Sequence, residues 1–434
     1  MPMPRPLSPA ILLSLTLLAA MPAQAQIGVP ALPGALRPEL PSGPGDPLDT
    51  LGERLQDGAD ILGQTARRGT ERLRESLEQQ RRARLDALLR QNRARLEPDA
   101  DGNPARKGEI LLIAPDAATL AKAATLGFAV AGEERLDALG LAVTRLALPP
   151  GLSLARAQAL LRKALPNATL APDSLHFAAT ASAPASSPAA PGWSLPPVDV
   201  AVGVIDGAPG AAAGAQAIAG FAPGAPFPGD HGSAMVWLLH RAGVRRVLVA
   251  DVFGQWLSGT GPAGGDALAI ARGLDWLIGR GVRVVSISLV GPANALVAQA
   301  LGAARQRGAV IVAAVGNDGP GAPPAYPASY PGVIAVTGVD RRNRALIEAG
   351  HALHLDYAAP GADMRAMDAR GRLVGVRGTS YATPLVAARA ATAMASRGAT
   401  ASMVIAALDR EAIDLPPRGA DAAFGRGLIC TICR

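Results

Sequence analysis

The sequence predicts an α/β protein whose largest part is a three-layer α/β/α unit with a mainly parallel sheet. From residue 198 onward, short runs of consecutive apolar residues alternate with longer helical stretches. Apolar runs without strict alternation indicate strands that are buried on both faces. The chain of 434 residues is also 49% hydrophobic and 18% charged. This composition suits a packed core and excludes a mostly disordered or fibrous protein.

The elements of this large unit follow from its apolar runs. The predicted strands cover residues 198–205, 247–252, 282–289, 309–315 and 333–336. The predicted helices cover residues 266–278, 293–307 and 380–395. Because helices separate consecutive strands, each connection is a crossover, and crossovers join parallel strands whose sheet is covered by helices on both faces. We expect the unit to span residues 198–428.

A smaller α+β domain is predicted over residues 108–177. Its expected elements are a strand at 109–114, a helix at 117–124, two strands within 128–148, a helix at 154–165 and a strand at 169–176. This β-α-β-β-α-β order is typical of ferredoxin-like domains. Residues 178–197 contain a low-complexity stretch of Ala, Ser and Pro, and they are interpreted as a linker.

The first hundred residues contain three further segments. An apolar run at 10–20 precedes Ala23-Gln24-Ala25, which predicts a signal peptide over residues 1–25 and hence an exported protein, periplasmic or secreted. Residues 26–50 are a linker rich in Pro and Gly. Residues 51–97 form an Arg-rich helical segment with an imperfect stripe of leucines. A solvated amphipathic helix is the favoured interpretation, and binding to an anionic lipid or to a partner is the alternative. No later run is long enough for a transmembrane anchor.

Charge and cysteine content exclude other classes of protein. The formal net charge is +7, but aromatic residues make up only 3% of the chain, too few for the stacking surfaces of single-strand nucleic-acid binders. An Arg-rich nucleic-acid site at residues 67–95 is a further alternative, and export argues against it. The two cysteines, Cys430 and Cys433, lack a second pair for a zinc site. In an oxidising compartment they favour a local disulfide.

Four polar motifs follow predicted strands or open predicted helices. They are Asp206-Gly207, Asp230-His231-Gly232-Ser233, Gly316-Asn317-Asp318-Gly319, and Gly378-Thr379-Ser380-Tyr381-Ala382-Thr383-Pro384. In open parallel sheets, reactive groups lie where strands end. An acid, an imidazole, an amide and a hydroxyl are thus expected at one edge of the sheet. Each residue alone has a structural explanation, such as a helix cap or a turn.

Together these motifs resemble those of the subtilase family of subtilisin-like serine peptidases, in which the catalytic residues follow the order Asp, His, Ser. The resemblance covers residues 198–428. It implies a subtilisin-like fold and hydrolysis of peptide or protein substrates by a serine endopeptidase. The implied catalytic residues are Asp206, His231 and Ser380, with Asn317 in the oxyanion hole.

The implied roles agree with the chemistry of these groups. A serine hydroxyl at its ordinary pKa needs an adjacent base, which His231 would supply while Asp206 fixes the imidazole tautomer. The Asn317 side chain would donate a hydrogen bond to the oxyanion. The resemblance also assigns substrate binding to Ser288, Leu289 and Gly291, where an extended peptide would pair as an added strand. No cofactor and no metal are implied.

Many exported subtilases carry a β-α-β-β-α-β pro-region that assists folding and blocks the active site. The resemblance therefore implies that the domain at 108–177 is a pro-region, that the protein is a zymogen, and that it cleaves itself within residues 177–190. The helical segment at 51–97 is unexplained by this scheme.

Departures from the family pattern leave alternatives open. Val290 stands where the family often has Gly, and it would narrow the substrate pocket. A non-catalytic binding protein with a subtilase fold is one alternative. An esterase of the α/β-hydrolase type is another, but Ala382 occupies the last Gly position of its G-x-S-x-G motif. A calcium loop at 98–107 does not fit the EF-hand pattern, so this segment is interpreted as a turn.

Overall fold

The computed structural model describes residues 69, 71–179, 193–257 and 264–433. The predicted signal peptide, the linker at 26–50, the start of the helical segment and most of the linker at 178–197 lie outside the described residues. All of the described residues belong to one compact unit.

The centre of the fold is a sheet of seven strands in the order β16-β15-β14-β12-β8-β10-β9. All of its neighbouring strands pair in parallel. The strands are β8 (Val202–Asp206), β9 (Ala217–Gly220), β10 (Val247–Asp251), β12 (Val284–Ile287), β14 (Val310–Ala314), β15 (Ile334–Val339) and β16 (Tyr357–Pro360). The predicted parallel sheet is therefore confirmed, although β8 begins four residues later than expected and runs through Asp206.

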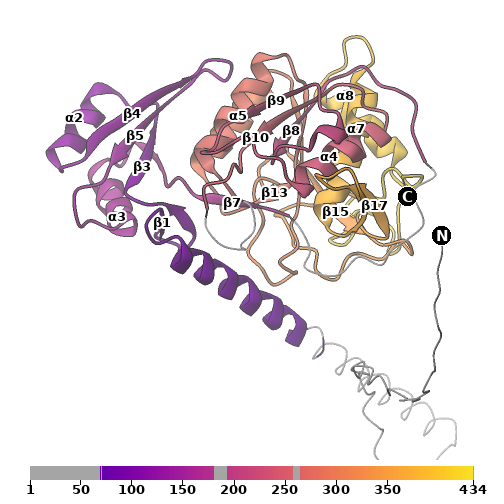
Figure 1. Ribbon diagram of the computed structural model, residues 1–434, viewed down its shortest axis with the longest axis horizontal. Helices are drawn as coiled ribbons and strands as arrows, with labels where there is room; N and C mark the ends of the chain where they lie inside the picture. The colour runs from indigo at the N-terminus through magenta and orange to yellow at the C-terminus, as the bar shows by residue number, and fades with distance from the viewer. Residues whose placement is uncertain (1–68, 70, 180–192, 258–263, 434) are drawn as a thin grey trace, which may run out of the picture. The chain divides into compact units, whose positions relative to one another are not determined.

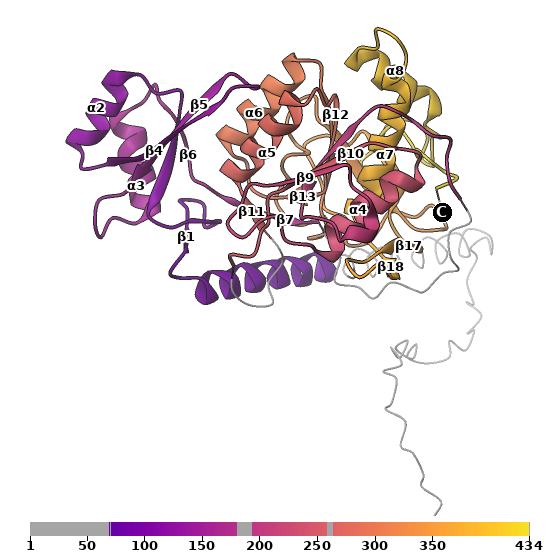
Figure 2. The same ribbon diagram turned by 45° about the horizontal axis from the view of Figure 1, so that its top comes forward.

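Helices cover both faces of this sheet (Figures 1 and 2). They are α4 (Asp230–Arg241), α5 (Ala267–Gly279), α6 (Ala295–Gln306), α7 (Thr379–Met394) and α8 (Ala401–Glu411). Successive residues of a strand point to opposite faces. Accordingly, Val204 of β8 packs into the apolar core that contains α4 and α7, and Ile205 packs into the core that contains α5 and α6. The three-layer α/β/α prediction is confirmed.

The smaller domain has the predicted β-α-β-β-α-β order. Its elements are β3 (Glu109–Ile113), α2 (Ala117–Thr125), β4 (Ala129–Leu136), β5 (Leu141–Ala147), α3 (Leu154–Ala164) and β6 (Thr169–Ala171). The strands form an antiparallel sheet in the order β4-β5-β3-β6. One face of this sheet packs on α2 and α3 in a separate apolar core.

The predicted last strand at 169–176 is wrong in one respect, because two strands occupy this stretch. Strand β6 ends at Ala171, and β7 (Leu175–Ala178) belongs to a different sheet, in which it lies between β11 (Gly264–Asp266) and β13 (Leu289–Val290). The carboxylate of Asp173 accepts a hydrogen bond of 2.9 Å from Leu268 N, at the start of α5. The chain therefore leaves the small sheet at Pro172 and continues along the large unit.

The helical segment at 51–97 is helical over residues 71–91 in the part that the structure describes. The prediction fails at its end, because Leu96 already belongs to a strand. Strands β1 (Leu96–Pro98) and β2 (Pro104–Arg106) form a hairpin. Its loop is the predicted turn, in which Asp99 Oδ1 accepts hydrogen bonds from the backbone N–H groups of Asp101 and Asn103. The carboxylate thus stabilises the turn.

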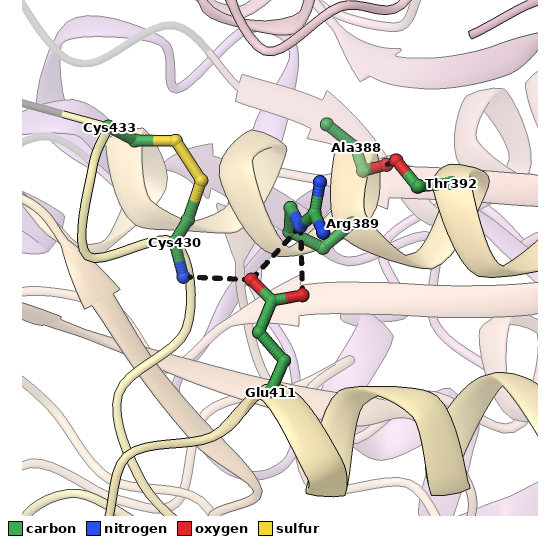
Figure 3. The surroundings of a disulfide bond; sticks show 6 residues. All are labelled: Ala388, Arg389, Thr392, Glu411, Cys430 and Cys433. Carbon is green, nitrogen blue, oxygen red and sulfur yellow. Dashed lines mark hydrogen bonds and ion pairs between the residues drawn. A yellow bond between two sulfur atoms is a disulfide. The ribbon is translucent and has the colours of Figure 1, made fainter. Parts of the chain in front are cut away.

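The C-terminal end of the large unit packs beside α7 and α8 (Figure 3). A disulfide joins Cys430 to Cys433, as expected. Glu411 of α8 accepts a hydrogen bond from Cys430 N at 3.2 Å and forms an ion pair of 2.8 Å with Arg389 of α7. A hairpin of β17 (Met364–Met367) and β18 (Leu373–Val376) precedes α7. None of the helices in the described ranges is long and apolar enough to cross a membrane.

Candidate active site

Asp206 and His231 form a hydrogen-bonded pair at the end of β8. Asp206 is the last residue of this strand and is fully buried, whereas His231 is the second residue of α4. His231 Nδ1 lies 2.8 Å from Asp206 Oδ2 and 2.9 Å from Oδ1. A carboxylate accepts hydrogen bonds, so this contact places the proton on Nδ1 and leaves Nε2 as the basic nitrogen.

The first turn of α4 approaches the strand end closely because residue 232 is a glycine. A Cβ atom at Gly232 would lie 2.0 Å from the carbonyl oxygen of Gly207. This is far shorter than a van der Waals contact, so any side chain would push α4 away. The glycine in the His-Gly sequence therefore sets the distance between the imidazole and the carboxylate.

Ser380 is the second residue of α7, and its side chain is fully buried. The preceding Gly378 has φ +143°, a conformation that favours glycine. Within the described residues, neither Ser380 Oγ nor His231 Nε2 has a hydrogen-bond partner. The ring of Tyr381 packs edge-on against His231, with 5.7 Å between ring centroids. The Ser380 hydroxyl and the Nε2 atom of His231 are thus both free to interact with a substrate.

Asn317 follows β14 and contacts both α7 and the strand β7 segment. Its Oδ1 accepts a hydrogen bond of 3.0 Å from Thr379 N. This contact fixes the orientation of the side-chain amide. Its Nδ2 donates a hydrogen bond to the carbonyl oxygen of Ala179, the residue after β7. The Asn317 side-chain amide, which the sequence analysis expected to donate a hydrogen bond, thus donates to a backbone carbonyl oxygen.

The segment that ends at Ala179 lies in an extended conformation between two strands. It pairs antiparallel with β13, where Leu289 lies opposite Ala178, and with β11 on its other side. Ala179 N donates a hydrogen bond of 3.1 Å to the carbonyl oxygen of Ser288. Ser288 Oγ in turn donates to the carbonyl oxygen of Ser380 at 3.0 Å. The strand predicted to bind substrate thus pairs with a segment of the same chain.

Gly291 differs from the other two predicted substrate-binding residues. Its backbone forms hydrogen bonds with Tyr326, at 2.8 and 3.2 Å, rather than with β7. Its contact with the extended segment is steric. A Cβ atom at this position would lie 2.6 Å from the ring of His176. Gly291 therefore leaves room for the buried imidazole of His176.

The sequence did not predict strand β11 or the role of Thr379. Gly264 and Gly265 of β11 have no apolar pattern, and only the pair of glycines marks a close backbone approach. Thr379 orients Asn317 through its backbone N–H, which no residue type can reveal. The remaining signal was the prediction that an extended peptide pairs as an added strand at Ser288, Leu289 and Gly291.

A cavity of about 400 Å³ lies beside Ala179. Its lining includes Val290, Gly316, Asn317 and Tyr326 from the large unit, together with residues of the helix at 71–91. No cluster of metal-binding side chains occurs in the ranges that the structure covers. The arrangement offers acid-base and nucleophilic groups at the end of an extended peptide segment.

Comparisons with known proteins test the resemblance in sequence and in fold. A family model described as "Subtilase family" matches residues 227–427. Over these residues, which are less than half of the chain, the sequence is similar to the subtilase family. The match includes His231, Asn317 and Ser380, and it begins after Asp206. The predicted resemblance is therefore confirmed.

Several curated relatives are similar to part of this chain. Subtilisin Savinase of Lederbergia lenta is 37% identical over 128 residues, which are 29% of this chain and 47% of that protein. Thermitase of Thermoactinomyces vulgaris is 36% identical over 159 residues, which are 36% of this chain and 56% of that protein. Minor extracellular protease Epr of Bacillus subtilis is 30% identical over 167 residues, 38% of this chain and 26% of that protein. The matches span about half of the first two relatives and about a quarter of the third.

The solved structure of fervidolysin from Fervidobacterium pennivorans superimposes with a TM-score of 0.60 at 18% identity. The superimposed region covers 76% of this chain and 61% of the fervidolysin chain. At this level of identity the likeness supports the fold, in agreement with the parallel sheet and the two layers of helices.

Proposed function

We propose that this protein is an exported serine endopeptidase that first cleaves its own chain after Ala179. One observation carries the proposal. The side-chain amide of Asn317 donates to the carbonyl oxygen of Ala179, in a segment that pairs antiparallel with β13. A carbonyl that receives this hydrogen bond at the end of an added strand has the position of a scissile carbonyl.

The proposed reaction begins when Ser380 Oγ attacks the carbonyl carbon of Ala179. His231 Nε2 takes the hydroxyl proton, and Asp206 stabilises the resulting imidazolium. The carbonyl oxygen becomes an oxyanion, which the Asn317 amide stabilises. The C–N bond to Thr180 then breaks, and His231 gives its proton to the leaving amine. Water hydrolyses the acyl-enzyme by the same steps, with His231 again as the base.

The domain at 108–177 acts as a pro-region in this proposal, and its contacts with the large unit support that role. Arg106 of β2, two residues before this domain, forms an ion pair of 2.7 Å with Asp266, at the start of α5. Arg272 Nε of α5 donates to Glu134 Oε2 at 2.6 Å. These contacts persist after cleavage because neither depends on the Ala179–Thr180 bond. The cleaved pro-region would remain in the cleft as an inhibitor.

Export rests on the signal sequence predicted for residues 1–25 and on the relatives. One of them, Minor extracellular protease Epr, is extracellular by its name. The disulfide between Cys430 and Cys433 also suits an oxidising compartment. We therefore place the protein in the periplasm or outside the cell, with peptides or proteins as substrates.

Labelling with a fluorophosphonate probe tests the proposal. The wild-type chain should be labelled at Ser380 and should yield a fragment that begins at Thr180. The Ser380→Ala variant should show neither the label nor the fragment. A wild-type chain that stays unlabelled and intact, although it is folded, would favour the alternative of a non-catalytic binding protein.

A further inference from the structure

The helix at 71–91 lies against the loop that carries Asn317. Arg84 forms an ion pair with Asp318, the residue after Asn317. The side chain of Leu77 covers Gly319, where a Cβ atom would lie 2.6 Å from Leu77 Cδ1. Arg74 lies above Gly321, where a Cβ atom would lie 3.3 Å from Arg74 Cβ. Three side chains spread over about three turns of the helix thus contact one loop of the large unit.

One side of this helix is turned toward the protein. Its half-buried and buried residues recur at helical spacing, and they include Leu73, Leu77, Arg81, Leu85 and Leu88. Leu88 joins the same apolar core as α5 and α6, with only 2% of its surface exposed. A stripe with this spacing belongs to one helix face. The leucine stripe seen in the sequence is therefore a contact surface.

The same helix walls the cavity beside Ala179. Arg81, Arg84, Leu85 and Leu88 line one side of it, and Asn317 lies on another. A substrate side chain next to the scissile carbonyl would enter this cavity. The helix therefore closes one side of the cavity beside Ala179 and Asn317.

We propose that the loop formed by Asp318, Gly319 and Gly321 is a docking surface for a basic amphipathic helix, and that residues 71–91 of this chain are its partner. This inference rests on the proposed function. The helix is a second inhibitory segment: after cleavage it holds the released pro-region on the catalytic site and delays activation.

The connection between the two segments explains why the helix matters after cleavage. Residues 71–179 remain one covalent piece, so the helix and strand β7 bind the large unit at two places. When two linked segments bind together, the second binds at a high effective concentration, and the pair dissociates far more slowly than either part. Loss of the helix contact should speed release without any change in the cleavage site.

Full-length variants test the docking surface. Leu77→Asp places a charge against Gly319, and Arg84→Ala removes the ion pair with Asp318. Arg90→Ala is the matched control, since Arg90 is exposed near the end of the same helix. None of these residues remains in the mature enzyme. After processing, we measure co-elution of the two fragments by size exclusion and the rate at which Ser380 reacts with the fluorophosphonate probe.

We expect Leu77→Asp to speed the appearance of reactive enzyme about tenfold or more, because it buries a charge in an apolar contact. Arg84→Ala should speed it about twofold to fivefold, an effect typical of a partly exposed ion pair, and high salt should reduce the difference. Arg90→Ala should behave as the wild type. Equal release rates in all four proteins would overturn the proposal.

Failure of the proposed function has a separate signature. If no variant produces a fragment that begins at Thr180, the processing scheme is wrong, whatever the helix does. The docking is then measured by hydrogen exchange in full-length Ser380→Ala. Protection of residues 316–321 should fall when Leu77→Asp is added and should not fall with Arg90→Ala. Unchanged protection in the Leu77→Asp variant would overturn the docking surface itself.

Discussion

Arg377 and Glu348 form a two-pronged ion pair between the segments on either side of the candidate site. Arg377 Nε lies 2.8 Å from Glu348 Oε1, and Arg377 Nη2 donates to Oε2 at 2.9 Å. Arg377 precedes Gly378 and the nucleophile. The carbonyl oxygen of Glu348 accepts a hydrogen bond of 2.9 Å from Gly319 N, in the loop after Asn317. One ion pair therefore connects the nucleophile turn with the oxyanion loop.

We predict that Arg377→Met lowers kcat about tenfold and changes KM little. The pair is mostly buried, so removal of one partner leaves the Glu348 charge uncompensated and is expected to cost about 3 kcal/mol of stability. The loop that carries Asn317 would then no longer be held at a fixed position relative to Ser380. Misplacement of catalytic groups lowers the rate of the chemical step. Kinetics on a peptide substrate and thermal unfolding measure both effects.

Arg372→Met is the control for this prediction, because Arg372 forms a similar ion pair with Asp368 but is 65% exposed. Arg377→Lys keeps the charge and should recover part of kcat. If Arg377→Met loses stability but keeps the wild-type kcat, the pair supports the fold and does not position the site.

The Asn317 amide provides a second prediction. Asn317→Leu should lower kcat by about 10²–10³, a figure adopted from subtilisin, with KM almost unchanged. Asn317→Asp keeps an acceptor for Thr379 N but loses the donor, so it should lose activity as well. Circular dichroism and thermal unfolding of both variants identify any general loss of structure. A folded Asn317→Leu variant with full kcat would contradict the oxyanion role.

The sequence predicted the sheet and the separate motifs well because both depend on local patterns. The apolar run at 309–315 and the following Gly-Asn-Asp-Gly are sufficient to place Asn317 at a strand end. The sequence could not predict that the chain leaves the small sheet at Pro172 and enters a different sheet as β7, because this depends on the contact of Asp173 with Leu268. The sequence also could not predict which part of the protein contacts the leucine stripe at 71–91, because Gly319 and Gly321 have no side chains that indicate a docking surface.

His176 predicts a pH dependence for release of the cleaved pro-region. Burial lowers the pKa of His176 to about 4 from its ordinary value of 6.5, because desolvation disfavours the charged ring. Above pH 6.5 the ring is neutral in both the bound and the released states. Between pH 6.5 and about 4 the released state binds a proton that the bound state cannot, so binding should weaken by about 1.4 kcal/mol per pH unit.

The measurement compares release rates of the cleaved pro-region in the wild type and in His176→Phe from pH 7 to pH 4. Asp173 acts in the opposite direction, because its burial raises the pKa of its carboxyl group, so a fall in pH favours the bound state there. The difference between the two proteins isolates the contribution of the imidazole. If both release the pro-region with the same pH profile, His176 has no part in it.

Val290 predicts which side chains the enzyme accepts next to the scissile bond. Both of its methyl groups lie near Gly316, where a Cβ atom would be 3.3 and 3.4 Å away, and Val290 lines the cavity beside Ala179. Val290→Gly should enlarge this space and raise kcat/KM for substrates with Phe before the cleaved bond about tenfold relative to those with Ala. Glycine within a strand also costs about 1 kcal/mol of stability. Val374→Gly, in β18, is the control for that cost. The stability cost is common to both glycine variants, and only the change at Val290 opens the cavity. If the ratio of kcat/KM for Phe and Ala substrates is the same in Val290→Gly as in the wild type, another residue limits the size of the pocket.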